Sequence, residues 1–187
     1  MHRGRRGPQA LSHADRTRWD ARFAGLGAGK PGPPGALVGR EHLVPTTGRA
    51  LDLACGRGTV AVWLARRGLA VDAVDVSPVA LAAGRALAGD AVVHWLEADL
   101  DDGLPVSGPY DVVVCQRFRD PALYPSLAGV LAPGGLLVVS VLSEVGDVGG
   151  PFRAPPGELV AAFGSLEVLH HAEAGGEASV VARRPGR

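Results

Sequence analysis

The sequence predicts an α/β protein built on a doubly wound, mostly parallel sheet of seven strands with helices on both faces. Three observations support this fold class. From Arg49 onward, short apolar runs rich in β-branched residues alternate with Ala- and Leu-rich stretches of helix length. The runs are apolar nearly throughout, as expected for strands covered on both faces. Two more strand-like segments close the chain and predict an antiparallel hairpin at the sheet edge.

The segment before this core is predicted to contain two short helices. Leu11–Phe23 has helical apolar spacing, and Ala36–Val44 is a second candidate that ends before a proline. The stretch Gly25–Gly35 between them is rich in Gly and Pro, so we expect a loop there.

Strands and helices alternate along the predicted core. The five parallel strands are expected at Ala50–Ala54, Ala70–Val74, Ala91–Leu96, Val112–Cys115 and Leu136–Leu142. The helices are expected at Thr59–Arg67, Ser77–Ala88, Pro121–Leu131 and Gly157–Phe163. The closing hairpin strands are expected at Leu166–His171 and Ser179–Arg183. Ser77-Pro78 is a typical helix start, because the hydroxyl caps the first turn and proline fits the first helical position.

Length and composition bound the domain organisation. The 187 residues suit one domain, for which we expect a disordered basic tail over 1–10, cap helices over 11–44 and the core over 45–187. Nineteen basic residues balance nineteen acidic ones, which argues against a general nucleic-acid binder. No apolar run reaches membrane-spanning length, so no membrane partner is expected. Two cysteines make no metal motif, so a cytoplasmic location and no bound metal are expected.

A glycine-rich turn follows the first predicted strand. Gly56 and Gly58 allow the sharp turn and the close approach of a ligand, but NAD-binding turns share this spacing. Asp52, inside the same strand, distinguishes a dinucleotide-binding turn from a turn that binds a positively charged ligand. A pyrophosphate at this turn gains nothing from a nearby negative charge, whereas a ligand with an ammonium group and a sulfonium does.

Carboxylates also end the next two strands. Asp75 is placed to accept hydrogen bonds from two ribose hydroxyls, a feature shared with NAD sites. Asp99 is placed to accept from an exocyclic amine such as that of adenine. Because the carboxyl ends of parallel strands meet at one edge, we expect Asp52, Asp75 and Asp99 to serve a common ligand.

These stretches resemble the successive motifs of class I S-adenosylmethionine (SAM)-dependent methyltransferases, which have a Rossmann-like fold. The resemblance covers about 49–142 and rests on Leu51–Gly58, Val74–Ser77, Glu97–Leu100, Asp111–Cys115 and Leu131–Gly135. It implies SAM as cofactor and S-adenosylhomocysteine (SAH) as product. It also implies that Gly56 and Gly58 line the methionine half of SAM, with Asp52 near its ammonium. The resemblance also implies that Gln116 and Arg117 lie below the methyl group that is transferred.

Upstream, Trp19-Asp20-Ala21-Arg22-Phe23 is similar to an element that precedes the core in the tellurite-resistance and thiol-methylating groups. By that resemblance Trp19 closes the site and Arg22 pairs with the SAM carboxylate. Packing on an amphipathic helix is the other reading of Trp19. The full expected set of cofactor-binding residues is Trp19, Arg22, Asp52, Ala54, Gly56, Gly58, Asp75, Val76, Asp99, Leu100 and Gln116.

The expected function is methyl transfer to a small-molecule acceptor by in-line displacement. No general base is evident, so the catalytic residues stay unassigned, and His94 is expected to be a core histidine. The segment 143–156, which covers substrate in many relatives, is short here. A non-catalytic SAM-binding module is therefore the alternative, and a nicotinamide-dependent reductase is a third, disfavoured by Asp52. The acceptor and the oligomeric state stay open.

Overall fold

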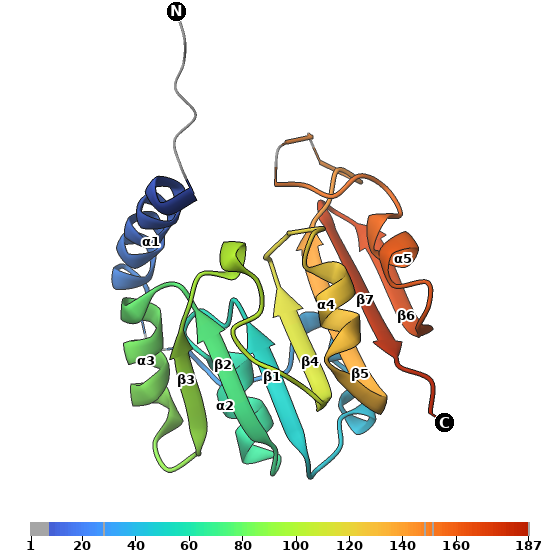
Figure 1. Cartoon of the computed structure of the whole chain (residues 1–187), viewed down its shortest axis with the longest axis horizontal. Coiled ribbons are helices and arrows are strands. Elements are labelled where there is room, and N and C mark those ends of the chain that lie inside the picture. Colours follow the sequence, from blue (N-terminus) through green and yellow to red (C-terminus); the bar gives the residue numbers. More distant parts are fainter. Residues whose placement is uncertain (1–7, 28, 148, 151, 187) are drawn as a thin grey trace, which may run out of the picture.

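The computed structural model describes residues 8–27, 29–147, 149–150 and 152–186, with side chains from residue 16 onward. Its centre is a seven-stranded sheet with the order β3-β2-β1-β4-β5-β7-β6 (Figure 1). The strands are β1 Arg49–Leu53, β2 Ala70–Asp75, β3 Val93–Glu97, β4 Tyr110–Gln116, β5 Leu131–Leu142, β6 Glu167–Ala174 and β7 Glu177–Arg183. β1 to β5 run parallel, while β7 runs antiparallel to both β5 and β6. The predicted fold class is confirmed.

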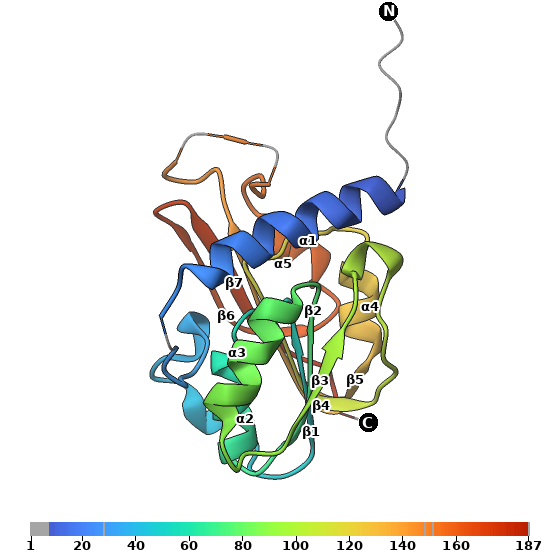
Figure 2. The same ribbon diagram turned by 90° about the vertical axis from the view of Figure 1, so that its left-hand side faces the viewer.

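Helices cover both faces of the sheet. The helices are α1 Pro8–Ala24, α2 Thr59–Arg66, α3 Pro78–Ala88, α4 Tyr124–Gly129 and α5 Glu158–Ala162. The short 3₁₀ turns are η1 Gly35–Leu37, η2 Glu41–Leu43 and η3 Leu100–Asp102. α2 packs with η1 on one face, and α4 and α5 pack on the other. Figure 2 shows α1 lying across the upper end of the sheet, above α3.

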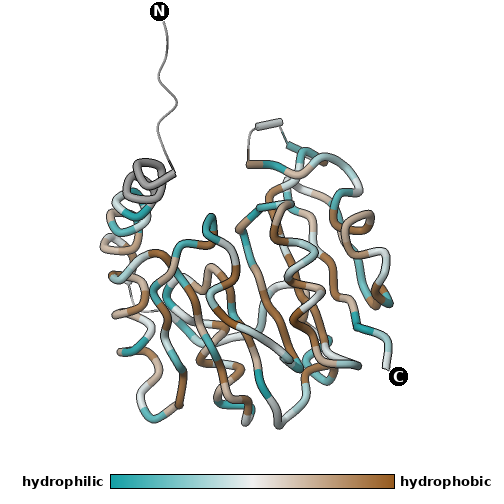
Figure 3. Tube along the Cα trace, viewed as in Figure 1, coloured by the Kyte–Doolittle hydropathy of each residue, from teal (hydrophilic) through white to brown (hydrophobic). Residues whose placement is uncertain are grey.

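The strand pattern divides the core into two clusters, one on each face. Leu51 and Val113 belong to the cluster under α4 and α5, whereas the neighbouring Ala50 and Val112 belong to the cluster under α2. The register pairs Leu51 with Val113 and Ala50 with Val112, so apolar side chains meet across the strands on both faces. Figure 3 shows the hydrophobic colour concentrated in the central strands.

Three predicted helices differ from those observed. The expected helix Ala36–Val44 is wrong, because η1 and η2 replace it. Gly39 between them takes a φ of 77°, which an α-helix does not allow. α4 is shorter than predicted at both ends. α1 begins three residues before the predicted helix, and residues 1–7 of the expected disordered tail lie outside the described residues.

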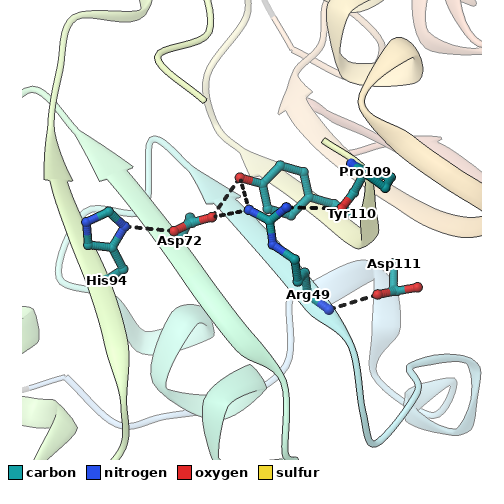
Figure 4. A network of polar contacts seen from close by, with 6 residues as sticks. All are labelled: Arg49, Asp72, His94, Pro109, Tyr110 and Asp111. Carbon is teal, nitrogen blue, oxygen red and sulfur yellow. Dashed lines mark hydrogen bonds and ion pairs between the residues drawn. The ribbon is translucent and has the colours of Figure 1, made fainter. Parts of the chain in front are cut away.

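A polar network joins side chains near the amino ends of β1, β2, β3 and β4 (Figure 4). The connection from β3 to β4 contains the 3₁₀ turn η3 and no α-helix. Asp72 accepts hydrogen bonds from the Tyr110 hydroxyl at 2.7 Å and from Arg49 at 3.1 Å, and its other oxygen lies 2.8 Å from His94 Nδ1. The expectation that His94 is a core histidine is wrong, since its side chain is 68% exposed on the outermost strand β3.

Two grooves open at the amino ends of these strands, one of them beside the Asp72 network. Both lie at the edge opposite to the predicted site. Ligands of open α/β sheets bind outside the carboxyl ends of the strands, so the candidate site is built at that edge. No helix among the described residues is long and apolar enough to cross a membrane.

Candidate cofactor and acceptor site

Three residues of the turn after β1 adopt the left-handed backbone conformation. Ala54, Gly56 and Gly58 have φ values of 51°, 53° and 66°. For Ala54 this conformation costs roughly 1–2 kcal/mol, because its Cβ approaches the backbone. A Cβ on Gly58 would collide with the ring of Trp95 in β3. The glycine at 58 therefore makes room for protein packing, while Ala54 and Gly56 are partly exposed at the carboxyl edge.

Asp52 lies buried beneath this turn. It is the last residue but one of β1 and is 2% exposed, and its Oδ2 has no hydrogen-bond partner among the described residues. Burial raises the pKa of the Asp52 carboxyl to about 8, a hydrogen bond from the Ala61 amide opposes the rise, and the charge of Asp75 adds to it. An unpartnered buried carboxylate is costly, so this oxygen fits a cationic or donor ligand group.

Asp75 ties the end of β2 to the glycine turn. Its Oδ2 accepts a hydrogen bond from the Gly56 amide at 2.7 Å, and its Oδ1 accepts one from the Ser77 amide at 2.9 Å. Burial raises its pKa, the backbone amides oppose the rise, and Asp20 adds to it. Each carboxylate oxygen carries a second lone pair, so hydroxyl donors of a ligand can still bind. Val76 beside it is half-buried.

Asp99 lies two residues after the end of β3, at the same edge of the sheet. Its Oδ1 accepts a hydrogen bond from the Asp101 amide at 3.0 Å, while its Oδ2 is buried with no partner among the described residues. Leu100 is 5% exposed and packs into the core under α4 and α5. The Ala98 amide donates to the Asp75 carbonyl at 3.1 Å, which fixes the two strand ends side by side.

Helix α1 covers this row of carboxylates. Trp19 stacks on Phe23 with ring centroids 5.8 Å apart, and the edge of the Phe23 ring lies 3.2 Å from where a Cβ on Gly56 would stand. Asp20 accepts a hydrogen bond from the Ser77 hydroxyl, and Arg16 pairs with Glu97 at 3.0 Å. The helix is thus anchored at the ends of β2 and β3.

The two predicted residues of α1 differ in exposure. Trp19 is half-buried, and the exposed Arg22 guanidinium lies 5.3 Å from the Trp19 ring centroid. Sequence reasoning missed Asp20 and Phe23 as anchors of the helix. Their three-residue spacing, which places them on one side of a helix, was the available signal.

The end of β4 forms the other side of the site. Gln116 is half-buried, and Arg117 after it takes a left-handed φ of 54°. The Arg117 amide donates to the Ser140 carbonyl of β5 at 2.7 Å. Farther along, Arg119 forms a bidentate ion pair with Glu158, which also accepts a hydrogen bond from the Tyr124 hydroxyl at 2.8 Å. The two arginines therefore differ: Arg119 is held by the protein, and Arg117 is exposed.

These residues fit the cofactor that the motifs imply. Two buried carboxylate oxygens, on Asp52 and Asp99, have no partner among the described residues, and both belong to segments at the same edge of the sheet. SAM carries an ammonium, a sulfonium and an adenine amine, which are the cationic and donor groups that such oxygens accept.

Comparisons with known proteins show which proteins the sequence is similar to. Residues 50–135 match the family model described as "Methyltransferase domain". The chain is 41% identical over 103 residues to ribosomal protein L11 methyltransferase of Dechloromonas aromatica, covering 54% of this chain and 34% of that protein. It is 32% identical over 111 residues to ubiquinone biosynthesis O-methyltransferase of Xanthomonas axonopodis pv. citri, covering 55% and 46%. The chain thus spans a third to a half of the length of these curated relatives.

Solved structures share the fold over more of the chain. TehB from Haemophilus influenzae superimposes with a TM-score of 0.72 at 20% identity, covering 81% of this chain and 62% of that one. Magnesium protoporphyrin IX methyltransferase from Synechocystis PCC 6803 with bound SAH gives 0.63 at 15% identity, covering 98% and 90%. The fold is that of the class I SAM-dependent methyltransferases. Residues 50–135 match the methyltransferase family model and the chain shares its fold with TehB, so the predicted resemblance to SAM-dependent methyltransferases is confirmed.

Proposed function

We propose that this protein transfers a methyl group from SAM to a small-molecule acceptor. One observation carries the proposal: carboxylates of three successive strand segments, Asp52, Asp75 and Asp99, line one edge of the sheet, and two of them have an unpartnered buried oxygen. The methyltransferase family model matches residues 50–135, which include all three carboxylates.

Each carboxylate takes a different part of SAM. Asp75 accepts from the ribose hydroxyls, and Asp99 with Leu100 and Val76 frames the adenine. Ala54, Gly56 and Gly58 of the glycine turn lie on the methionine side, where Asp52 faces the ammonium. Gln116 lies below the methyl group. The support for this arrangement is the order of the strands, since β3, β2, β1 and β4 are neighbours in that sequence.

The bound cofactor supplies an activated methyl group on a sulfonium. The residues of this chain therefore orient the reactants and exclude water, which are the main sources of rate in such a displacement. Trp19 and Arg22 on α1 cover the cofactor from above, with Arg22 toward its carboxylate. Phe23 packs against Gly56 and supports this role of the helix.

A small molecule is the acceptor that the composition favours. The equal counts of basic and acidic residues disfavour a nucleic-acid substrate. The curated relatives have names that refer to a ribosomal protein and to ubiquinone biosynthesis, so their substrates differ widely. We propose one domain acting in the cytoplasm, where its two free cysteines stay reduced. Of the expected cap over 11–44, α1 keeps this role, whereas η1 packs with α2 against a face of the sheet.

Calorimetry and turnover test the proposal together. We expect SAM and SAH to bind with micromolar or better affinity, NAD(H) and NADP(H) not to bind, and SAH to accumulate with an acceptor panel of thiols, phenols and amines. Binding of NAD(P) without SAM contradicts the proposal. Binding of SAH with no turnover across the panel favours the second candidate, a SAM-binding module without activity. The short segment between β5 and α5 supports that candidate, because it leaves little chain to cover an acceptor.

A further inference from the structure

Backbone strain and positive charge coincide at the end of β4. Among the described residues, two that are not glycine adopt left-handed φ angles, Ala54 at 51° and Arg117 at 54°. They follow β1 and β4, which pair through Leu53 and Cys115. The two residues therefore flank the point where the strand order reverses, which is where open α/β sheets bind ligands. Strained residues cluster at such sites because the surrounding structure holds them there.

The backbone alone does not explain an arginine at position 117. Its amide donates to the Ser140 carbonyl, which continues the β4–β5 ladder and holds the turn. Glycine adopts a left-handed φ without a Cβ penalty, so a purely structural turn favours glycine.

The guanidinium of Arg117 reaches along the carboxyl edge over β5. It lies 3.8 Å from Oε2 of Glu177, the first residue of β7, and the two side chains are 71% and 44% exposed. Figure 1 shows β7 starting at the edge where β4 and β5 end. An exposed pair at this distance is weak. A ligand carboxylate that meets the planar guanidinium with two hydrogen bonds would replace Glu177.

We propose that Arg117 recognises the methyl acceptor and that the acceptor is a small organic acid bearing a carboxylate. This inference rests on the proposed methyl transfer. In that step a lone pair of the acceptor's nucleophilic atom forms the new bond to carbon, the sulfur–methyl bond breaks, and its electron pair stays on sulfur. A nucleophile that starts as a thiol or phenol releases its proton to water. Arg117 forms none of these bonds and holds the carboxylate so that the nucleophile faces the methyl group.

Acceptors of similar size with and without a carboxylate test this inference. The thiols are 3-mercaptopropionate, 2-mercaptoethanol and cysteamine, and the phenols are 4-hydroxybenzoate and 4-hydroxybenzamide. Steady-state rates are measured at saturating SAM, and binding of the same compounds to the SAH complex is measured by calorimetry. We expect the acids to be preferred at least 10-fold in kcat/KM, or in affinity if a compound is bound without turnover.

Variants then assign the preference to one side chain. Arg117→Gln should raise KM or Kd for the acids about 10- to 100-fold, the loss of a charged hydrogen-bonded pair, with small changes for the neutral compounds. Glu177→Gln should lower the KM for acids, because it removes the competing carboxylate. Arg85→Gln on the exposed side of α3 is the matched control and should leave all constants unchanged.

Arg117→Gly separates the side chain from the backbone. It should lose the acid preference as Arg117→Gln does, yet melt at a higher temperature, because glycine relieves the left-handed strain. SAH affinity should stay unchanged in both variants. If the wild type does not bind SAH, that result contradicts the proposed function rather than this inference. Equal use of acids and neutral compounds by the wild type, or equal effects of Arg117→Gln on both, overturns the inference.

Discussion

The carboxylate of Asp75 accepts a hydrogen bond from the Gly56 amide at 2.7 Å and thereby joins the end of β2 to the turn after β1. The same carboxylate accepts from the Ser77 amide at the start of α3. One buried side chain therefore fixes two turns that the sequence separates by about twenty residues. Its role in cofactor binding and its role in holding the site together can be tested apart.

Replacing Asp75 should weaken SAM binding strongly. Asp75→Ala removes the acceptor of two ribose hydroxyls, each contributing about 1.5–3 kcal/mol for a charged acceptor. Calorimetric titration with SAM measures the loss, and Asp75→Asn, which keeps the shape, should lose less. Far-UV circular dichroism verifies that the variants are folded. A SAM affinity unchanged in Asp75→Ala would refute the proposed placement of the cofactor.

Asp52 should make the stability of the unliganded protein depend on pH. Its pKa is about 8 in the folded chain and about 4 when unfolded, so the folded state binds the proton more tightly. The contribution of this group to the free energy of unfolding is therefore fully present below pH 4, and it is lost as the pH rises from 4 through 8. Urea denaturation from pH 5 to 9 measures the slope.

The Asp52→Asn variant is the control for this pH dependence. It keeps an oxygen that accepts from the Ala61 amide but does not titrate, so the slope should shrink by up to about 1.4 kcal/mol per pH unit. Asp75 shifts in the same direction and leaves a residual slope. An identical slope in wild type and variant would show that Asp52 is ionised in the folded protein.

Removing the ring that packs on the glycine turn should loosen the cofactor site. Phe23→Ala deletes a half-buried aromatic side chain against Gly56, and we expect SAM to bind about 5- to 30-fold more weakly, corresponding to about 1–2 kcal/mol. Leu26→Ala, at a position 47% exposed, is the matched control and should bind normally. Equal affinities of the two variants would mean that the Phe23 ring does not contribute to the site.

Gly84 in α3 should be intolerant of a methyl group. A Cβ there would stand 2.6 Å from the Trp95 ring, so Gly84→Ala should destabilise the fold by about 1–3 kcal/mol despite the better helix propensity of alanine. Gly129→Ala in α4 has no neighbour within 4 Å and should be neutral or stabilising by up to about 1 kcal/mol. Thermal and urea unfolding of both variants give the comparison. A stabilising Gly84→Ala would show that Trp95 can move aside.

Local sequence patterns determined most of the architecture. Apolar β-branched runs and helix breakers predicted all seven strands to within a few residues, except for an earlier start of β5 and longer hairpin strands. They also predicted the antiparallel closing hairpin, whose strand β7 lies between β5 and β6. These features are readable because side-chain periodicity and turn chemistry act within a few residues of the chain. The row of carboxylates followed from the same pattern, since parallel strands end at one edge.

Only the tertiary structure decided how distant segments meet. His94 is exposed because β3 is an edge strand. The residues of a strand do not reveal whether it lies at the edge or in the centre of the sheet. Trp95 fills the space that Gly58 and Gly84 leave. Gly58, which the sequence assigned to ligand contact together with Gly56, therefore also serves packing. The docking of α1 depends on Asp20 meeting Ser77 across 57 positions of sequence. Such contacts arise from long-range packing, which overrides local propensity and which no short stretch of sequence encodes.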